Sequence, residues 1–182
     1  MQRSAIKSFT GSILALIILF AAAPAAAQAV VEIDKFLASD GDVADRFGTS
    51  VAIEGNTAAI GAPDPLGDSS GAAYIFKRQL DGSWEETQKL TASDAAASDY
   101  FGYSVDVFFN QVIVGAYGND DNGNSSGSAY IFDQNLGGTA NWGQRKKLTA
   151  SDAAAYDYFG YSVSLDYDWA VVGAYGNDDS GD

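Results

Sequence analysis

The sequence predicts an all-β protein built from repeated four-stranded units, and three observations carry this prediction. A passage that begins with Phe-Gly occurs at residues 47, 101 and 159. Each copy contains short β-branched and aromatic runs, and Gly, Asn, Asp and Ser separate these runs. A period of more than fifty residues is typical of proteins whose units bury their apolar faces against neighbouring units. Repetition of a four-strand unit predicts an incomplete β-propeller, in which each copy is one antiparallel blade.

The second copy shows the expected strands most clearly. Ser104–Phe109 and Gln111–Tyr117 form the first two strands, which a tight turn at Asn110 joins. Ser128–Asp133 follows a loop of Gly, Asn, Asp and Ser, and Trp142–Thr149 follows a second Gly-containing loop. The same frame applies to the other two copies.

Large side chains recur along the third strands and before the fourth strands. Tyr130 and Phe132 alternate in the second copy, as Tyr74 and Phe76 do in the first, so we expect them in the core between blades. Lys89 and Lys147 also occupy equivalent positions in the fourth strands of the first and second copies. A lysine at a strand edge discourages pairing with foreign strands, and this is the role expected for both residues.

The chain begins and ends within a repeat. Val30–Ala38 occupies the frame of a fourth strand and precedes the first Phe-Gly pair. The third copy stops after its second strand. Residues 28–182 should therefore form one orphan outer strand, two whole blades and half of a third. Because propellers close with about four to eight blades, we expect part of a larger propeller, which further blades would complete. Self-association of such partial rings is the alternative.

Residues 1–27 have the pattern of a secretory signal peptide. Arg3 and Lys7 precede the apolar run Ile13–Ala23, and Ala25–Ala27 fits a small-residue cleavage site. The apolar run is shorter than the roughly 20 residues that cross a bilayer as a helix. We therefore expect a protein that is secreted or held at the cell surface, without a membrane span after cleavage. An uncleaved N-terminal anchor is the alternative.

Composition excludes several classes of function. The sequence contains 24 acidic and 10 basic residues, with a formal net charge of −14. Such a surface repels phosphate backbones, so nucleic acid is not an expected partner, whereas cations and basic surfaces are favoured. The sequence has no histidine and no cysteine. Ser-His-Asp, Cys-His and histidine-ligated metal chemistry are therefore excluded within the chain, and we expect a protein that is not an enzyme.

Strand parity places most of the acidic residues on one side of the molecule. In an up-and-down blade, the loops after the second and fourth strands emerge at the same rim. Lys77, Arg78 and Arg145–Lys147 should lie toward the other rim or the outer edge. The predicted ligand-binding rim consists of Asp64, Asp68, Asp94, Asp99, Asp152, Asp157, Asp178 and Asp179. Alternatively, these are turn residues that keep the protein soluble, and some cap the Ser-Asp-Ala-Ala-Ala turns.

The loop Gly118–Gly127 is a candidate metal site. Asp120, Asp121, Asn122 and Asn124 offer the hard oxygen ligands that calcium prefers. The alternative is an ordinary polar turn, because Asp, Asn, Gly and Ser are the usual turn residues.

The three Phe-Gly pairs are each followed by a Gly-Ala tripeptide: Gly61-Ala62-Pro63, Gly115-Ala116-Tyr117 and Gly173-Ala174-Tyr175. This pattern resembles the FG-GAP repeat, the blade unit of the integrin alpha-chain propeller and of many exported bacterial proteins. The resemblance implies a propeller, usually of seven blades, with a binding or adhesion role outside the cell. Integrin-like blades carry a calcium loop between the first two strands. Here Asn110 alone stands at that place in the second copy, so this calcium site does not transfer.

The sequence thus predicts an exported, non-enzymatic binding or adhesion module that meets an extracellular protein, a glycan or cations through its acidic rim. Two alternatives stay open. The chain could be a scaffold fragment without independent activity, or a non-catalytic part of a larger extracellular hydrolase.

Overall fold

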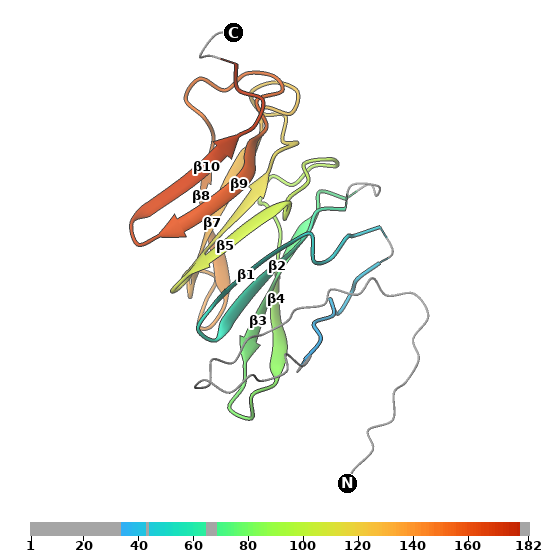
Figure 1. The fold of residues 1–182 in the computed structure, drawn as a ribbon, viewed down its shortest axis with the longest axis vertical. Helices are drawn as coiled ribbons and strands as arrows, with labels where there is room; N and C mark the ends of the chain where they lie inside the picture. Colours follow the sequence, from blue (N-terminus) through green and yellow to red (C-terminus); the bar gives the residue numbers. More distant parts are fainter. Residues whose placement is uncertain (1–33, 43, 65–68, 179–182) are drawn as a thin grey trace, which may run out of the picture.

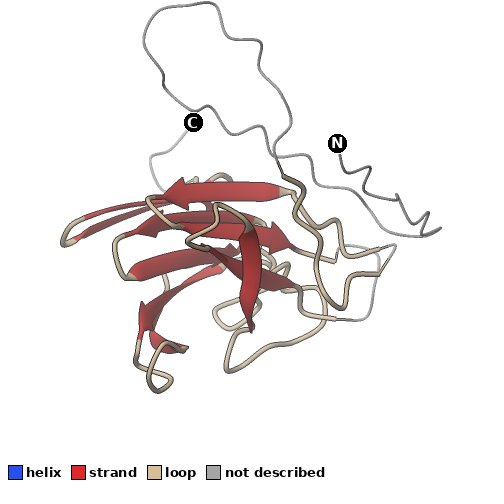
Figure 2. Cartoon of the chain, turned by 90° about the horizontal axis from the view of Figure 1, so that it is seen from below, coloured by secondary structure: helices blue, strands red, loops and turns tan. Residues whose placement is uncertain are grey.

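The computed structural model describes residues 34–42, 44–64 and 69–178, which form an all-β structure (Figures 1 and 2). The strands form three antiparallel sheets, and each sheet follows the chain order. Blade I consists of β1 (Ser50–Glu54), β2 (Thr57–Ala62), β3 (Ala72–Arg78) and β4 (Trp84–Leu90). Blade II consists of β5 (Ser104–Phe108), β6 (Gln111–Ala116), β7 (Ser128–Gln134) and β8 (Trp142–Leu148). Blade III contains β9 (Phe159–Asp166) and β10 (Trp169–Ala174). The predicted class, partial propeller blades of antiparallel strands, is confirmed.

The blades stack side by side in chain order (Figure 1). β5 packs against β1 and β2, and β9 packs in the same way against β5 and β6. Apolar side chains fill each seam between blades. Tyr130 and Phe132 are buried between blades I and II, as expected for core residues, and Tyr74 and Phe76 are buried in blade I. The hydrophobic core therefore lies between the sheets, which is why a single blade cannot bury its apolar faces alone.

The Phe-Gly and Gly-Ala motifs form the closest contacts between neighbouring blades. Gly102 has a φ of 93°, and a Cβ there would lie 2.1 Å from the carbonyl oxygen of Ala72. A Cβ on Gly61 would lie 1.8 Å from the carbonyl oxygen of Gly102. Gly160 and Gly115 repeat both contacts at the next seam. Glycine is needed at these positions because the Phe-Gly turn of one blade packs directly on the backbone of the preceding blade.

The predicted orphan strand differs from the structure. Residues 30–33 lie outside the described residues, and residues 34–38 form no strand. Because no strand pairs with this segment in the described part of the chain, it lacks a hydrogen-bonded ladder. It nevertheless packs against blade I as a fourth strand would. The Phe36 ring contacts Phe76 and Trp84 at centroid distances of 4.9 and 5.4 Å, and Asp34 accepts a hydrogen bond from the Trp84 amide at 3.1 Å.

The two ends of the described stack expose side chains whose counterparts are buried. Val51 on β1 is 54% exposed, whereas its blade II counterpart Val105 is 8% exposed. Val171 on β10 is 68% exposed, whereas its counterpart Ile113 is fully buried. The buried counterparts contact a neighbouring blade, whereas Val51 and Val171 have no described blade beside them.

The predicted signal peptide, residues 1–27, lies outside the described residues, as do Asp68 and Asp179 of the predicted rim. Within the described part of the chain, no helix is long and apolar enough to cross a membrane.

Candidate functional site

The loops after the second and fourth strands lie along one edge of the blades, which we call the loop rim. It comprises the described residues of 63–71, 91–103, 117–127, 149–158 and 175–178. The six described aspartates of the predicted ligand-binding rim belong to these loops. The structure divides the described ones into three groups: buried in turns, paired between blades, and exposed.

Two of the predicted rim aspartates are buried turn residues. Asp99 accepts a hydrogen bond from the Ala96 amide at 2.9 Å, and Asp157 accepts one from the Ala154 amide at 2.7 Å. Both residues are almost fully buried. Burial is the main reason why the pKa of Asp99 is raised above its usual value. These two carboxylates are therefore not exposed at the rim, and their hydrogen bonds agree with the alternative interpretation as caps of the turns.

Asp64 is also buried, and it accepts a hydrogen bond from the Ser69 hydroxyl. Asp94, Asp152 and Asp178 are exposed at the loop rim, and ligand binding by them stays a prediction. Only these three described members of the predicted set therefore present carboxylates to solvent.

A cluster of Asp, Lys and Tyr occurs twice in the described part of the chain, once where the N-terminal segment packs on blade I and once between blades I and II, and we call it the seam cluster. In its first copy, the Lys89 ammonium lies 2.7 Å from an Asp40 carboxylate oxygen, and the Tyr74 hydroxyl donates to the other oxygen at 2.8 Å. The hydrogen bond from Lys89 is the main cause that lowers the pKa of Asp40. Burial, followed by the hydrogen bond to Asp40, raises the pKa of Tyr74 to about 12. The aspartate follows the segment that stands at the position of a fourth strand, whereas the lysine and tyrosine belong to the next blade.

The second copy joins blade I to blade II. Lys147 on β8 lies 2.5 Å from a carboxylate oxygen of Asp94, and its ammonium is 5.3 Å from the ring centroid of Tyr130. The Tyr130 hydroxyl is buried and makes no hydrogen bond within the described part of the chain. Burial raises the pKa of Tyr130. The cluster therefore holds a cation between two blades and beside an aromatic face, where both neighbours favour its charged form.

Lys147 also contacts the loop Gly118–Gly127. It pairs with Asp121 and donates to the side-chain oxygen of buried Asn119 at 3.1 Å. Burial alone would lower the pKa of Lys147, but hydrogen bonds to Asp121 and Asp94 outweigh it, and the pKa is raised. The expectation that Lys147 lies away from the acidic loops is therefore wrong. Lys147 and Lys89 both form ion pairs, and the interpretation as edge-strand lysines did not predict these pairs.

The candidate calcium ligands have separate partners. Asp120 accepts a hydrogen bond from the Ser125 amide at 2.6 Å, and Asn124 donates to the Tyr156 hydroxyl at 3.1 Å. The Asn122 amide donates to the Ser126 hydroxyl at 3.2 Å. In the described ranges, no group of three or more His, Cys, Asp or Glu side chains could hold a metal ion. Calcium binding by Asp120, Asp121, Asn122 and Asn124 stays a prediction, and the Lys147 ammonium competes for Asp121.

A group of tyrosines that the sequence analysis did not predict lies at the loop rim and on the adjoining start of β9. We call it the tyrosine surface, and it consists of Tyr100, Tyr103, Tyr117, Tyr158, Tyr161 and Tyr175. Blades II and III contribute three each from equivalent positions, in the motifs Tyr-Phe-Gly-Tyr and Gly-Ala-Tyr. The repetition of these two motifs in the sequence could have predicted the tyrosine surface. In the first copy Arg46, Thr49 and Pro63 stand at these positions.

The rings of the tyrosine surface contact one another across the seam. Tyr103 and Tyr161 have centroids 4.9 Å apart, and their hydroxyls are hydrogen-bonded at 3.0 Å. Tyr117 lies 5.5 Å from Tyr161, and Tyr161 stacks on Tyr175 at 5.1 Å with an interplanar angle of 27°. Tyr175 is 75% exposed and Tyr161 is 38% exposed. The surface is thus continuous from blade II to blade III and open to solvent at its blade III end.

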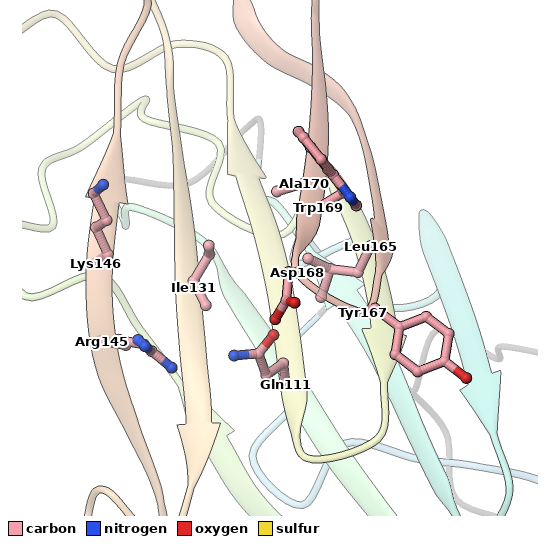
Figure 3. Close-up of a pocket in the computed structure, with 9 residues that line it drawn as sticks. All are labelled: Gln111, Ile131, Arg145, Lys146, Leu165, Tyr167, Asp168, Trp169 and Ala170. Carbon is pink, nitrogen blue, oxygen red and sulfur yellow. The ribbon is translucent and has the colours of Figure 1, made fainter.

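The opposite side of blades II and III contains a cleft of about 220 Å³ (Figure 3). Ile131 on β7 and Leu165 and Ala170 of blade III line its apolar part. Arg145 and Lys146 of β8 stand on the other side of the cleft in Figure 3. No prediction from the sequence included this cleft.

Comparison with known proteins identifies the repeat. A family model described as the FG-GAP repeat matches residues 30–76, 84–132 and 142–182, which is more than half of the chain. The second and third matches begin at the first residues of β4 and β8, so each spans a fourth strand and continues into the next blade. The first match includes residues 34–38, which pack on blade I as a fourth strand would. A search of curated proteins finds no match. The chain belongs to the FG-GAP repeat family.

Proposed function

We propose that this chain is an exported, non-catalytic binding module that contacts a neutral or basic ligand, a protein or a glycan, at its loop rim. FG-GAP repeats build propeller-type modules that often bind ligands and are generally not catalytic. On this proposal the signal peptide exports the protein, and the loop rim contacts the ligand. We also propose that the Gly118–Gly127 loop binds calcium.

The tyrosine surface is the observation that carries the proposal. Tyrosines supply large contact areas at little conformational cost, and they are enriched at protein interfaces. Here six of them form one partly exposed surface, and exposed Asp94, Asp120 and Asp178 stand in loops of the same rim. This combination favours ligands that have flat or apolar faces and carry no negative charge.

The carboxylates of the rim support binding rather than acid–base catalysis. A catalytic pair would combine Asp94 with Asp99, or Asp152 with Asp157. In each pair the second residue is buried and bonded to a backbone amide of its own turn. It is therefore committed to the fold and is not available to a substrate.

The experiment compares two tyrosine variants on oligosaccharide and peptide arrays that carry neutral, cationic and anionic members. Substitution of both Tyr161→Ser and Tyr175→Ser should abolish binding to neutral or cationic members. Tyr167→Ser is the matched control, because Tyr167 is 70% exposed but lies in the β9–β10 turn at the opposite side. The proposal fails if no member binds, or if the control variant loses binding to the same extent.

A purely structural role is the second candidate, and the exposed end faces favour it. Val51 at one end of the stack and Val171 at the other are both more than half exposed, as expected of surfaces that pack against further blades. Circular dichroism and limited proteolysis of the full chain separate the candidates. A cooperative, protease-resistant fold supports an independent module, whereas a labile and aggregating chain supports the structural role.

A further inference from the structure

Tyr103 and Tyr161 meet across the seam between blades II and III with their hydroxyl groups in contact. The Tyr103 hydroxyl donates a hydrogen bond to the Tyr161 hydroxyl at 3.0 Å, and the ring centroids lie 4.9 Å apart at an interplanar angle of 48°. Tyr103 immediately precedes β5, and Tyr161 lies near the start of β9, so the contact joins residues 58 positions apart in the chain. The packing of two blades therefore holds two phenols together.

The geometry of this pair suits the formation of a carbon–carbon bond between the rings. When two tyrosines are oxidised, they couple through the ring carbons adjacent to the hydroxyl-bearing carbons. The hydroxyls of Tyr103 and Tyr161 lie closer together than their ring centroids, so the ends of the rings that carry the coupling carbons face each other. Groups that are held in contact in this way react far faster than the same groups free in solution.

Neighbouring tyrosines connect the pair to an exposed ring. Tyr117 lies 4.5 Å from Tyr103 and 5.5 Å from Tyr161, measured between ring centroids. Tyr158 lies 5.9 Å from Tyr117, and Tyr156, which is 54% exposed, lies 6.3 Å from Tyr158. Because phenol rings at such short separations exchange an electron readily, oxidation of any one of them can be passed to the pair.

The composition of the chain leaves aromatic rings as the main targets of an oxidant. The sequence contains no cysteine, and its one methionine is Met1. Cysteine and methionine are the side chains that oxidants commonly modify, and here no sulfur after residue 1 competes for the oxidant. A disulfide cannot join the blades for the same reason, so a covalent link between them must use other side chains.

We propose that Tyr103 and Tyr161 form a modification site at which a one-electron oxidant joins blades II and III through a dityrosine cross-link. Each phenol gives one electron to the oxidant and one proton to water, and the two phenoxyl radicals then form a bond between their ortho carbons. The hydrogen on each coupled carbon moves to the ring oxygen as a proton, which restores both hydroxyls. In all, two electrons pass to the oxidant, two protons pass to water, and the chain loses two hydrogen atoms.

Oxidation of the full chain in dilute solution with a photo-activated ruthenium complex and persulfate tests this proposal. Denaturing electrophoresis separates single chains from cross-linked dimers, and peptide mass spectrometry identifies the joined residues. The single-chain fraction should contain the Tyr103–Tyr161 cross-link. In urea above the unfolding midpoint, its yield should fall by about tenfold or more, because the blades no longer hold the rings in contact. The proposal is overturned if single chains lack this cross-link, or if unfolding does not lower its yield.

Variants show whether contact or exposure selects the site. Tyr103→Phe and Tyr161→Phe keep the ring but remove one phenol, so each should lower the dityrosine fluorescence of single chains by about tenfold. Tyr167→Phe is the matched control, because Tyr167 is 70% exposed but contacts Phe108 and Phe109 instead of another tyrosine. It should leave the fluorescence unchanged, and circular dichroism checks that each variant is folded. Equal losses in Tyr161→Phe and Tyr167→Phe, or no loss in Tyr161→Phe, contradict the proposal.

Cross-linking goes beyond the ligand binding proposed above and does not depend on it. A chain that cross-links at Tyr103 and Tyr161 but binds no array member contradicts only the binding proposal. A chain that binds array members but forms no cross-link contradicts only the modification site.

Discussion

Replacement of Lys147 by methionine should destabilise the seam between blades I and II. Lys147 is 20% exposed and pairs with Asp94 and Asp121, which are 37% and 56% exposed. Methionine keeps most of the aliphatic stem but removes the charge and leaves two carboxylates without their cation. Exposed ion pairs contribute about 0.2–1 kcal/mol, whereas removal of one partner from a buried pair costs about 3–5 kcal/mol. The half-buried Lys147 lies between these limits, so we expect a loss of about 2 kcal/mol.

Urea unfolding followed by tryptophan fluorescence measures this loss. With a slope of about 2 kcal/mol/M, the midpoint should fall by roughly 1 M. Lys89→Met is the matched control, because Lys89 is 41% exposed and has one carboxylate partner, Asp40. It should lower stability by about 0.5–1 kcal/mol.

A double-mutant cycle with Asp94→Asn isolates the pair itself. We expect a coupling free energy of about 1 kcal/mol between Lys147 and Asp94. The reasoning is refuted if this coupling is below about 0.3 kcal/mol, or if Lys147→Met costs no more than Lys89→Met.

Three further changes test other parts of the structure. Gly102→Ala should lower the free energy of unfolding in urea by about 3 kcal/mol or more, because its Cβ would lie 2.1 Å from a backbone oxygen. Gly82→Ala is the control, with a similar φ of 89° but no close atom, and it should cost about 1 kcal/mol. The pKa of Asp99 is raised, chiefly by burial, so its ionised form destabilises the fold at a pH above that pKa, and this penalty disappears as the pH falls toward the ordinary aspartate value. Asp99→Asn should therefore flatten the pH dependence of the unfolding midpoint at pH values just above that ordinary value. A hydrogen bond with Tyr161, followed by burial, raises the pKa of Tyr103 to about 12, so Tyr161→Phe should bring the ultraviolet titration of Tyr103 back toward its ordinary value of about 10.

The sequence predicted the strands of blade II closely, because the repeats align their β-branched runs and turns. The first strand ends at Phe108 instead of Phe109, since Phe109 has a φ of 50° and already belongs to the turn. The prediction of an orphan strand was wrong for residues 34–38, because a matching pattern of side chains does not by itself supply a strand to pair with. Phe36 and Asp34 of this segment still contact blade I, although no strand pairing holds the segment there.

The site was predicted less well, because charge position along the chain does not show which charges meet. Lys147 and Asp94 lie 53 residues apart and come together only when blades I and II pack. Asp99 looks like an exposed loop residue in the sequence, but its bond to the Ala96 amide buries it. The tyrosine surface could have been found, because Tyr-Phe-Gly-Tyr and Gly-Ala-Tyr each recur in register.

A comparison of the repeats separates the residues that build the fold from those that can choose a ligand. The Phe-Gly turn and the Gly-Ala pair recur at both described seams, and the seam cluster occurs both before blade I and between blades I and II, where close packing leaves little freedom for change. At the loop rim the repeats differ, since Arg46, Thr49 and Pro63 occupy the positions that tyrosines occupy in blades II and III. Positions that change while the seams stay the same can be altered without loss of the fold. Ligand choice is therefore expected to depend on these rim positions, and exchange of the blade III tyrosines for their first-repeat counterparts should change binding while the urea midpoint stays nearly constant.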